Sequence, residues 1–209
     1  ADVLIENFAP GTMERLQLLS PGVIRVGLSA TIAPLEEIAR YLVGYEGEDA
    51  RDCKIVEVQF AKQMDFKVIS PVKSLVESDF LLKHKKMYEA IHELVQQHKT
   101  TVIFTNTRSA TERVVHNLKE MFPSYYQDHI AAHHGSLSKA ARFLTEQELR
   151  EGKLKVVVSS TSLELGIDIG YIDLVICLGS PKSVARFLQR AGRAGHQLHA
   201  TVKARIIVM

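Results

Sequence analysis

The sequence predicts an α/β fold in which helices cover both faces of a parallel β-sheet. Short apolar runs rich in Val, Ile and Leu alternate along the chain with longer segments of helical periodicity, which is typical of βαβ units. These runs are apolar at nearly every position rather than at every second one, as expected of strands buried on both faces. Hydrophobic residues make up 46% of the 209 residues, which is ordinary for a globular core.

In the first part of the chain, residues 23–28 form a β-branched run that predicts a strand. Pro34 suits the first turn of a following helix, and Gly44 is placed to end that helix. Residues 45–54 are charged and contain glycine, which predicts a linker. Two extended segments are expected after it, at residues 55–60 and 66–72.

From about residue 80 onward, helices and strands are predicted to alternate. The expected strands are residues 101–105, 129–133, 155–159, 174–178 and 204–208. The expected helices include residues 87–98, 109–122, 138–151 and 183–191. Ser109 followed by Glu112 predicts a capping box, Gly152 is placed to end one helix, and Ser183 is placed to begin another.

The ligand site of such a sheet lies beyond the carboxyl ends of its strands. Polar or small residues follow three expected strands at this edge: Thr105 and Asn106, then Gly135 and Ser136, then Ser160 and Thr161. The sequence therefore predicts that these residues gather at one edge of the sheet.

Three arginines mark the helix predicted near the C-terminal end. Arg186, Arg190 and Arg193 recur at i, i+4 and i+7, where like charges repel by a few tenths of a kcal/mol per pair. Gly192 costs about 1 kcal/mol more than alanine in a helix interior. Stability alone does not favour this combination. An anionic partner explains it, because guanidinium groups suit bidentate contact with phosphate.

Residues 189–196, QRAGRAGH, resemble motif VI of superfamily 2 helicases, which carries their arginine finger. Other segments resemble further helicase motifs in the same order: residues 29–31 (SAT, motif III), 102–108 (VIFTNTR, motif IV), 133–136 (HHGS) and 160–168 (STSLELGID, motif V). The amino-acid sequence at residues 104–118, 159–176 and 180–196 resembles more narrowly that of the large helicase-related (Lhr) family of archaea and bacteria.

The resemblance implies a RecA-like second helicase domain, of the P-loop NTPase type, and a role for each motif. Arg193 would be the arginine finger, with Arg190 as its partner and Gln189 orienting or sensing the γ-phosphate. His196 stands where a second arginine is frequent. Gly166 would allow close backbone approach, and Asp168 would bind the nucleotide ribose. The nucleic-acid contacts would come from Thr105, Asn106, Gly135, Ser136, Ser160 and Thr161, and coupling would involve Ser29, Ala30 and Thr31.

The resemblance also predicts how the chain is divided. The sequence contains no G-x-x-x-x-G-K-[ST] loop and no Asp-Glu-x-His run, which lie before motif III in the family. We therefore interpret residues 1–46 as the C-terminal remnant of a first RecA-like domain, 47–80 as linker and entry strands, and 81–209 as the second RecA-like domain. The fragment alone is expected not to hydrolyse ATP, whereas the full-length enzyme would use ATP and Mg²⁺.

The resemblance implies a single-stranded DNA or RNA partner, with DNA or an RNA–DNA hybrid favoured, beside the missing first domain. The net charge of +2 is too small to argue nucleic-acid binding by itself. Two isolated cysteines, without a C-x-x-C pair, fit a reducing cytoplasm, and no apolar stretch predicts a membrane span. His133 and His134 lack companions at metal-ligand spacing, so no metal site is expected.

Two alternatives remain open at this stage. A non-catalytic nucleic-acid binding module of the same fold would explain why no P-loop is present. An ordinary doubly wound metabolic enzyme is disfavoured, because the sequence has no G-x-G-x-x-G turn and ends in an arginine-rich helix.

Overall fold

The computed structural model describes residues 24–28, 34–46, 48–56, 63–164, 170–194 and 201–208. The chain divides into two compact units, residues 1–60 and 61–209, and each is described by itself. Among the described helices, none has the length and apolar character that a membrane crossing requires.

The first unit contains one described helix and a small hairpin. Helix α2, Leu35–Val43, ends at Gly44 as predicted, and Pro34 is its N-cap rather than a residue of its first turn. Gly44 has a φ of 73°, a left-handed conformation that costs glycine least. The segment expected to be a linker contains strands β1, Tyr45–Glu46, and β2, Asp49–Ala50, which pair antiparallel.

The strand predicted at residues 23–28 is wrong for the part that is described. Residues 24–28 form no strand, and Ile24, Val26 and Leu28 are exposed. The segment is instead tied to the end of α2 by the Arg25 guanidinium, which donates to the carbonyl of Val43 at 2.8 Å. Ser29, Ala30 and Thr31 lie outside the described residues.

The described residues of the second unit form a six-stranded sheet in the order β3-β8-β7-β4-β6-β5. All pairings between these strands are parallel, which confirms the predicted parallel sheet. The strands are β3 Met64–Ile69, β4 Thr101–Phe104, β5 Ile130–His133, β6 Val156–Ser159, β7 Leu174–Leu178 and β8 Val202–Ile207. The β3 edge lies within the segment that was predicted to lead into this domain.

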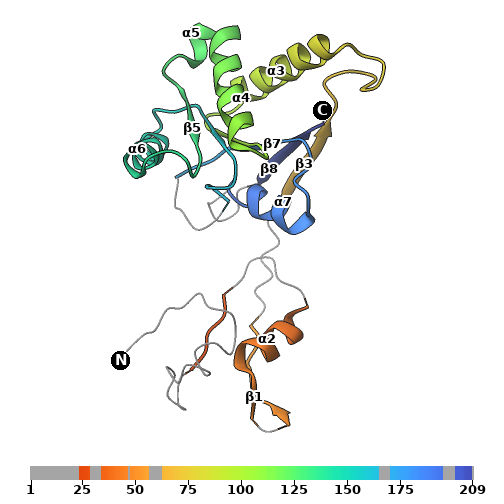
Figure 1. The fold of residues 1–209 in the computed structure, drawn as a ribbon, viewed down its shortest axis with the longest axis vertical. Coiled ribbons are helices and arrows are strands. Elements are labelled where there is room, and N and C mark those ends of the chain that lie inside the picture. The colour runs from red at the N-terminus through yellow and green to blue at the C-terminus, as the bar shows by residue number, and fades with distance from the viewer. Residues whose placement is uncertain are drawn as a thin grey trace. The chain divides into compact units, whose positions relative to one another are not determined.

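Helices lie on both faces of this sheet, as Figure 1 shows. They are α3 Phe80–Gln96, α4 Arg108–Met121, α5 Pro123–Tyr126, α6 Lys139–Arg150 and α7 Val184–Ala191. One core cluster joins Ile103 and Ile176 of the sheet to α3, α4 and α5. The other joins Val102 and Val175 to α6 and α7. Because neighbouring strand residues point to opposite faces, the alternation of these residues places a hydrophobic layer on each side.

The start of α4 differs from the predicted capping box. Thr107 is the N-cap, and its hydroxyl accepts a hydrogen bond from the Ala110 amide at 3.1 Å. Ser109 lies inside the first turn of the helix. Glu112, the expected partner of Ser109, turns instead to His134 on β5's carboxyl end. The contact with His134 therefore determines the orientation of Glu112. A local cap pattern in the sequence carries no information about such a long-range contact.

The capping difference gives a direct test. Thr107→Ala should reduce the free energy of unfolding by about 1 kcal/mol, because an amide at the start of α4 loses its acceptor. Ser109→Ala is the matched control and should change it by less than about 0.5 kcal/mol. Chemical denaturation of both variants measures the difference. A larger loss for Ser109→Ala than for Thr107→Ala would restore the capping box predicted from the sequence.

Candidate functional site

Hydrogen-bond register brings three turns to one edge of the sheet. Phe104 of β4 and His133 of β5 are both paired with Ser159 of β6. These three residues are the last of their strands, so the chain leaves all three strands at the same level. The turns that follow carry every nucleic-acid contact predicted from the sequence.

The turn after β4 separates the two residues predicted there. Asn106 is exposed, and its amide donates to the carbonyl of Ser180, in the turn after β7, at 3.1 Å. Thr105 is buried, and its hydroxyl lies 2.8 Å from the Thr111 hydroxyl and donates to the Thr107 carbonyl. The buried Thr105 side chain serves the start of α4, so a contact between this hydroxyl and nucleic acid is disfavoured by the geometry.

The turn after β5 presents a small, exposed polar surface. Gly135 and Ser136 are both exposed, and the Ser136 hydroxyl accepts a hydrogen bond from the Arg108 guanidinium at 2.6 Å. Arg108 begins α4 and was not among the predicted contacts, although it stands in the motif IV segment. Its exposed guanidinium adds a positive charge next to Ser136, so this turn is suited to an anion.

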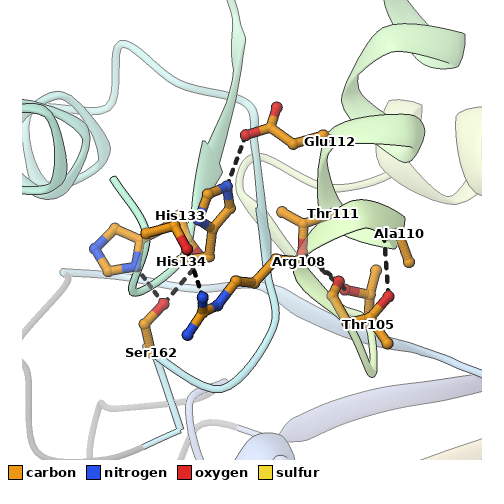
Figure 2. Close-up of polar contacts among 10 residues, drawn as sticks. Thr105, Arg108, Ala110, Thr111, Glu112, His133, His134 and Ser162 are labelled. Atoms are coloured by element: carbon orange, nitrogen blue, oxygen red, sulfur yellow. Dashed lines mark hydrogen bonds and ion pairs between the residues drawn. The ribbon is translucent and has the colours of Figure 1, made fainter. Parts of the chain in front are cut away.

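His133 and His134 join this turn to its neighbours (Figure 2). The His134 Nε2 atom lies 2.6 Å from a Glu112 carboxylate oxygen on α4. His133 is buried, with Nδ1 2.7 Å from the Ser162 hydroxyl and Nε2 2.9 Å from the Glu146 carboxylate on α6. Both histidines therefore have structural partners. No group of three potential metal ligands occurs within the described part of the chain.

The turn after β6 carries Ser160 and Thr161. Ser160 is buried, at 5% exposure, which disfavours a contact between its hydroxyl and nucleic acid, whereas Thr161 is exposed at the edge of the sheet. The Thr161 carbonyl accepts a hydrogen bond from the Glu164 amide at 3.0 Å, which closes the turn. Gly166 and Asp168, the residues predicted to contact the nucleotide, lie outside the described residues.

Helix α7 carries Arg186 and Arg190, and Ser183 caps it as predicted by accepting from the Arg186 amide at 3.1 Å. Arg190 is fully buried, at 0% exposure. Its Nε donates to a Glu164 carboxylate oxygen at 2.7 Å, and Nη2 lies 2.6 Å from the same oxygen. Its guanidinium also lies 5.1 Å from the centroid of the Phe104 ring, within reach of a cation–π contact.

Arg193 follows α7 and differs from Arg190 in its surroundings. It is half-buried, its guanidinium donates to the Glu164 backbone carbonyl at 3.0 Å, and burial lowers its pKa. Gln189 is half-buried on the last turn of the helix. His196 lies outside the described residues. Of the two predicted arginines, Arg193 is therefore the one with an accessible surface.

Sequence reasoning missed Glu164. The signal was a single acid between two leucines at residues 163–165. Glu164 is 7% exposed, and an ionised carboxylate at that depth requires a partner. Only the tertiary structure shows that the partner is Arg190.

A helicase family model matches most of the second unit. The family described as helicase conserved C-terminal domain matches residues 83–197. The ATP-dependent helicase Lhr-Core of Methanothermobacter thermautotrophicus is 55% identical over 199 residues, which cover 95% of this chain and 23% of that protein. The Lhr-Core helicase of Saccharolobus solfataricus is 54% identical over 89% of this chain and 21% of that protein. The chain thus spans less than a quarter of the length of these relatives.

Two solved helicase structures are also similar to this chain. The structure of Mycobacterium smegmatis helicase Lhr bound to ssDNA and AMP-PNP has a TM-score of 0.83 and 40% identity, over 94% of this chain and 25% of that one. The helicase MrfA bound to DNA and AMPPNP has a TM-score of 0.69 and 26% identity, over 86% of this chain and 24% of that one.

The buried His133 predicts a pH dependence of stability. Burial lowers the pKa of His133, and the hydrogen bond with Glu146 opposes this only in part. As the pH falls below about 6.5, the ordinary value, the unfolded chain binds a proton before the folded chain does. The contribution of neutral His133 is therefore complete above that pH and is lost as the pH falls through the lowered folded pKa.

His133→Gln should remove this dependence. It should cost about 1–3 kcal/mol at pH 8, because the half-buried Ser162 and Glu146 lose the hydrogen bonds of the buried ring, but stability should then fall less steeply between about pH 7 and 5. Ser124→Ala, an exposed change on α5 that alters no titratable group, is the control and should keep the wild-type slope. Denaturation at a series of pH values measures the slopes. Equal slopes for wild type and His133→Gln would remove His133 from this role.

Proposed function

Because the chain belongs to the helicase conserved C-terminal domain family, we propose that it supplies the arginine finger and half of the single-strand binding surface of an ATP-dependent helicase. The observation that carries the proposal is the meeting of Arg193 with the turn after β6. One side of that turn presents the exposed Thr161, and the other accepts the Arg193 guanidinium through the Glu164 carbonyl. The residue proposed to act on the nucleotide, Arg193, and the residue proposed to bind the strand, Thr161, therefore meet at one short segment.

The nucleotide half of the proposal rests on charge. Arg193 donates to the Glu164 backbone carbonyl, and its guanidinium group is charged at neutral pH. Such a group stabilises the charge that develops on a transferring phosphoryl group. Gln189 lies one turn away on α7, and Gly166 and Asp168 are proposed for the phosphates and ribose. ATP and Mg²⁺ would be held jointly with the other RecA-like domain, and this chain would contribute the contacts named here.

The nucleic-acid half rests on the three aligned turns. Asn106, Ser136 and Thr161 are exposed at the carboxyl ends of β4, β5 and β6, and Arg108 adds a charge beside them. Hydroxyl and amide groups of this kind bind phosphate oxygens, which positions a strand without reading its sequence. We propose a single-stranded DNA or RNA ligand, because the M. smegmatis relative is described as bound to ssDNA.

Substitution of Arg193 tests the finger. In the longer protein that carries this chain, Arg193→Ala should lower nucleic-acid-stimulated ATP turnover by about 10²-fold or more, with the KM for ATP nearly unchanged, because a finger acts in the transition state. Arg193→Lys should not restore turnover, since an ammonium cannot reproduce the planar fork. Arg113→Ala, an exposed change on α4, is the control. Steady-state kinetics decide, and near-normal turnover of Arg193→Ala would reject the proposal.

Substitution of Thr161 tests the strand-binding surface. Thr161→Val keeps the side-chain volume and removes the hydroxyl. The affinity for two unrelated single-stranded oligonucleotides should therefore fall equally, by about fivefold, which corresponds to the loss of one hydrogen bond. The salt dependence should remain shallow, because neutral groups release few counterions. Ser124→Ala on α5 is the control. Fluorescence titrations measure the affinities, and a loss confined to one sequence would contradict backbone contact.

A further inference from the structure

Glu164 is the meeting point of three guanidinium groups. Its Oε1 atom contacts the buried Arg190, its Oε2 atom lies 3.5 Å from the Nε of Arg186, and its backbone carbonyl accepts from Arg193. The three arginines come from α7 and the residues after it, whereas Glu164 ends the turn after β6. The contacts of the Glu164 carboxylate with Arg186 and Arg190 therefore join the turn after β6 to α7.

Stability alone is a weak reason for this cluster. Removing a carboxylate and a guanidinium from water is costly, and a well-packed apolar pair in the same place is frequently as stable or more so. A buried pair is explained better when a particular geometry has to be kept. Here the geometry concerns the end of α7, where Arg190, at 0% exposure, lies beside Phe104 and Glu164.

The contact at Arg190 reaches Arg193 through the backbone. The Arg193 amide donates to the Arg190 carbonyl at 3.0 Å, so these residues belong to one turn of chain. When the Arg190 side chain is held, the backbone that carries Arg193 is held with it. The Glu164 carbonyl then meets the Arg193 guanidinium directly, which restricts the side chain as well.

We infer that Glu164 is a positioning residue whose carboxylate holds the end of α7 against the turn after β6 and so orients Arg193. This inference rests on the proposed function, in which Arg193 acts on the nucleotide. Thr161 and Glu164 close the same turn. A strand bound at Thr161 is therefore linked through Glu164 to Arg193. A displacement of a catalytic group by about 1 Å can cost about 10²-fold in rate, so such a restraint matters for turnover.

The direct test measures the order of the Arg193 side chain without any ATP. In the 209-residue chain, NMR relaxation of the arginine Nε–Hε groups reports their motion, and Arg193→Lys identifies the Arg193 signal by its loss. We expect Arg193 to be ordered in the wild type and mobile in Glu164→Gln. Glu164→Gln alone leaves the buried Arg190 charge without its partner, which should lower the melting temperature. The double variant Glu164→Gln/Arg190→Met removes both buried charges, so its melting temperature should be closer to the wild-type value, while Arg193 stays mobile.

The outcomes separate positioning from stability. An ordered Arg193 in a folded double variant would overturn the inference, since the pair would then serve stability alone. If that variant does not fold, Glu164→Asp decides, because it keeps the charge but shortens the reach by one methylene group. Arg193 should gain mobility in Glu164→Asp, and an unchanged signal would overturn the inference. Arg186→Ala removes only the outer guanidinium and should leave Arg193 ordered.

Kinetics in the longer protein complete the test. Glu164→Gln should lower the nucleic-acid-stimulated kcat by about tenfold or more, with the KM for ATP within about twofold, as expected when orientation rather than binding is lost. Arg193→Ala in the same assay separates the two claims. Normal turnover of Arg193→Ala rejects the proposed function, whereas loss in Arg193→Ala with normal turnover in Glu164→Gln rejects the positioning role alone.

Discussion

The parallel hydrogen-bond register of β4, β6 and β5 is the constraint on which the site depends. Parallel neighbours run in the same direction, so strands that end opposite one another deliver their turns to the same edge. Phe104, Ser159 and His133 end at one level through these pairings. A shift of one residue would move each side chain to the other face of the sheet and would bury the polar turn residues in a core cluster. The two hydrophobic layers therefore keep the site residues aligned.

Buried and partly buried polar contacts join the turns once the register has aligned them. His133 connects β5 to α6 and to Ser162, His134 connects β5 to α4, and Glu164 connects the turn after β6 to α7. Each contact joins residues that are far apart in sequence. In a low-dielectric environment such groups are costly when unpaired, so each restricts its element to the arrangement in which the partner is present. Exposed groups, such as Ser136 and Thr161, then project from a rigid frame, which favours a preorganised binding surface.

Much of the fold was predictable because its signals are local. The strand at 174–178 and the caps at Ser183 and Gly44 were predicted correctly, since apolar runs and cap residues act within a few positions. The capping box at Ser109 failed because α4 begins at Arg108 with Thr107 as its N-cap, which places Ser109 inside the first turn. Residues 24–28 of the strand expected at 23–28 form no strand, because β-branched residues favour extended backbone but do not by themselves provide backbone pairing. Thr105 was placed correctly at the end of β4, yet its hydroxyl turned inward to Thr111.

The sequence by itself determined which chemical groups stand at the strand ends and that arginines recur at helical spacing from residue 186 to residue 193, because both are matters of residue type and spacing. It did not decide which arginine is buried. Arg190 and Arg193 look alike in the sequence, but one is enclosed by Phe104 and Glu164 and the other keeps an accessible surface. That difference depends on how α7 packs against the sheet, since a guanidinium is buried only where an opposite charge meets it. Glu164 supplies that charge from a turn 26 residues away in sequence, and only the tertiary structure brings the two together.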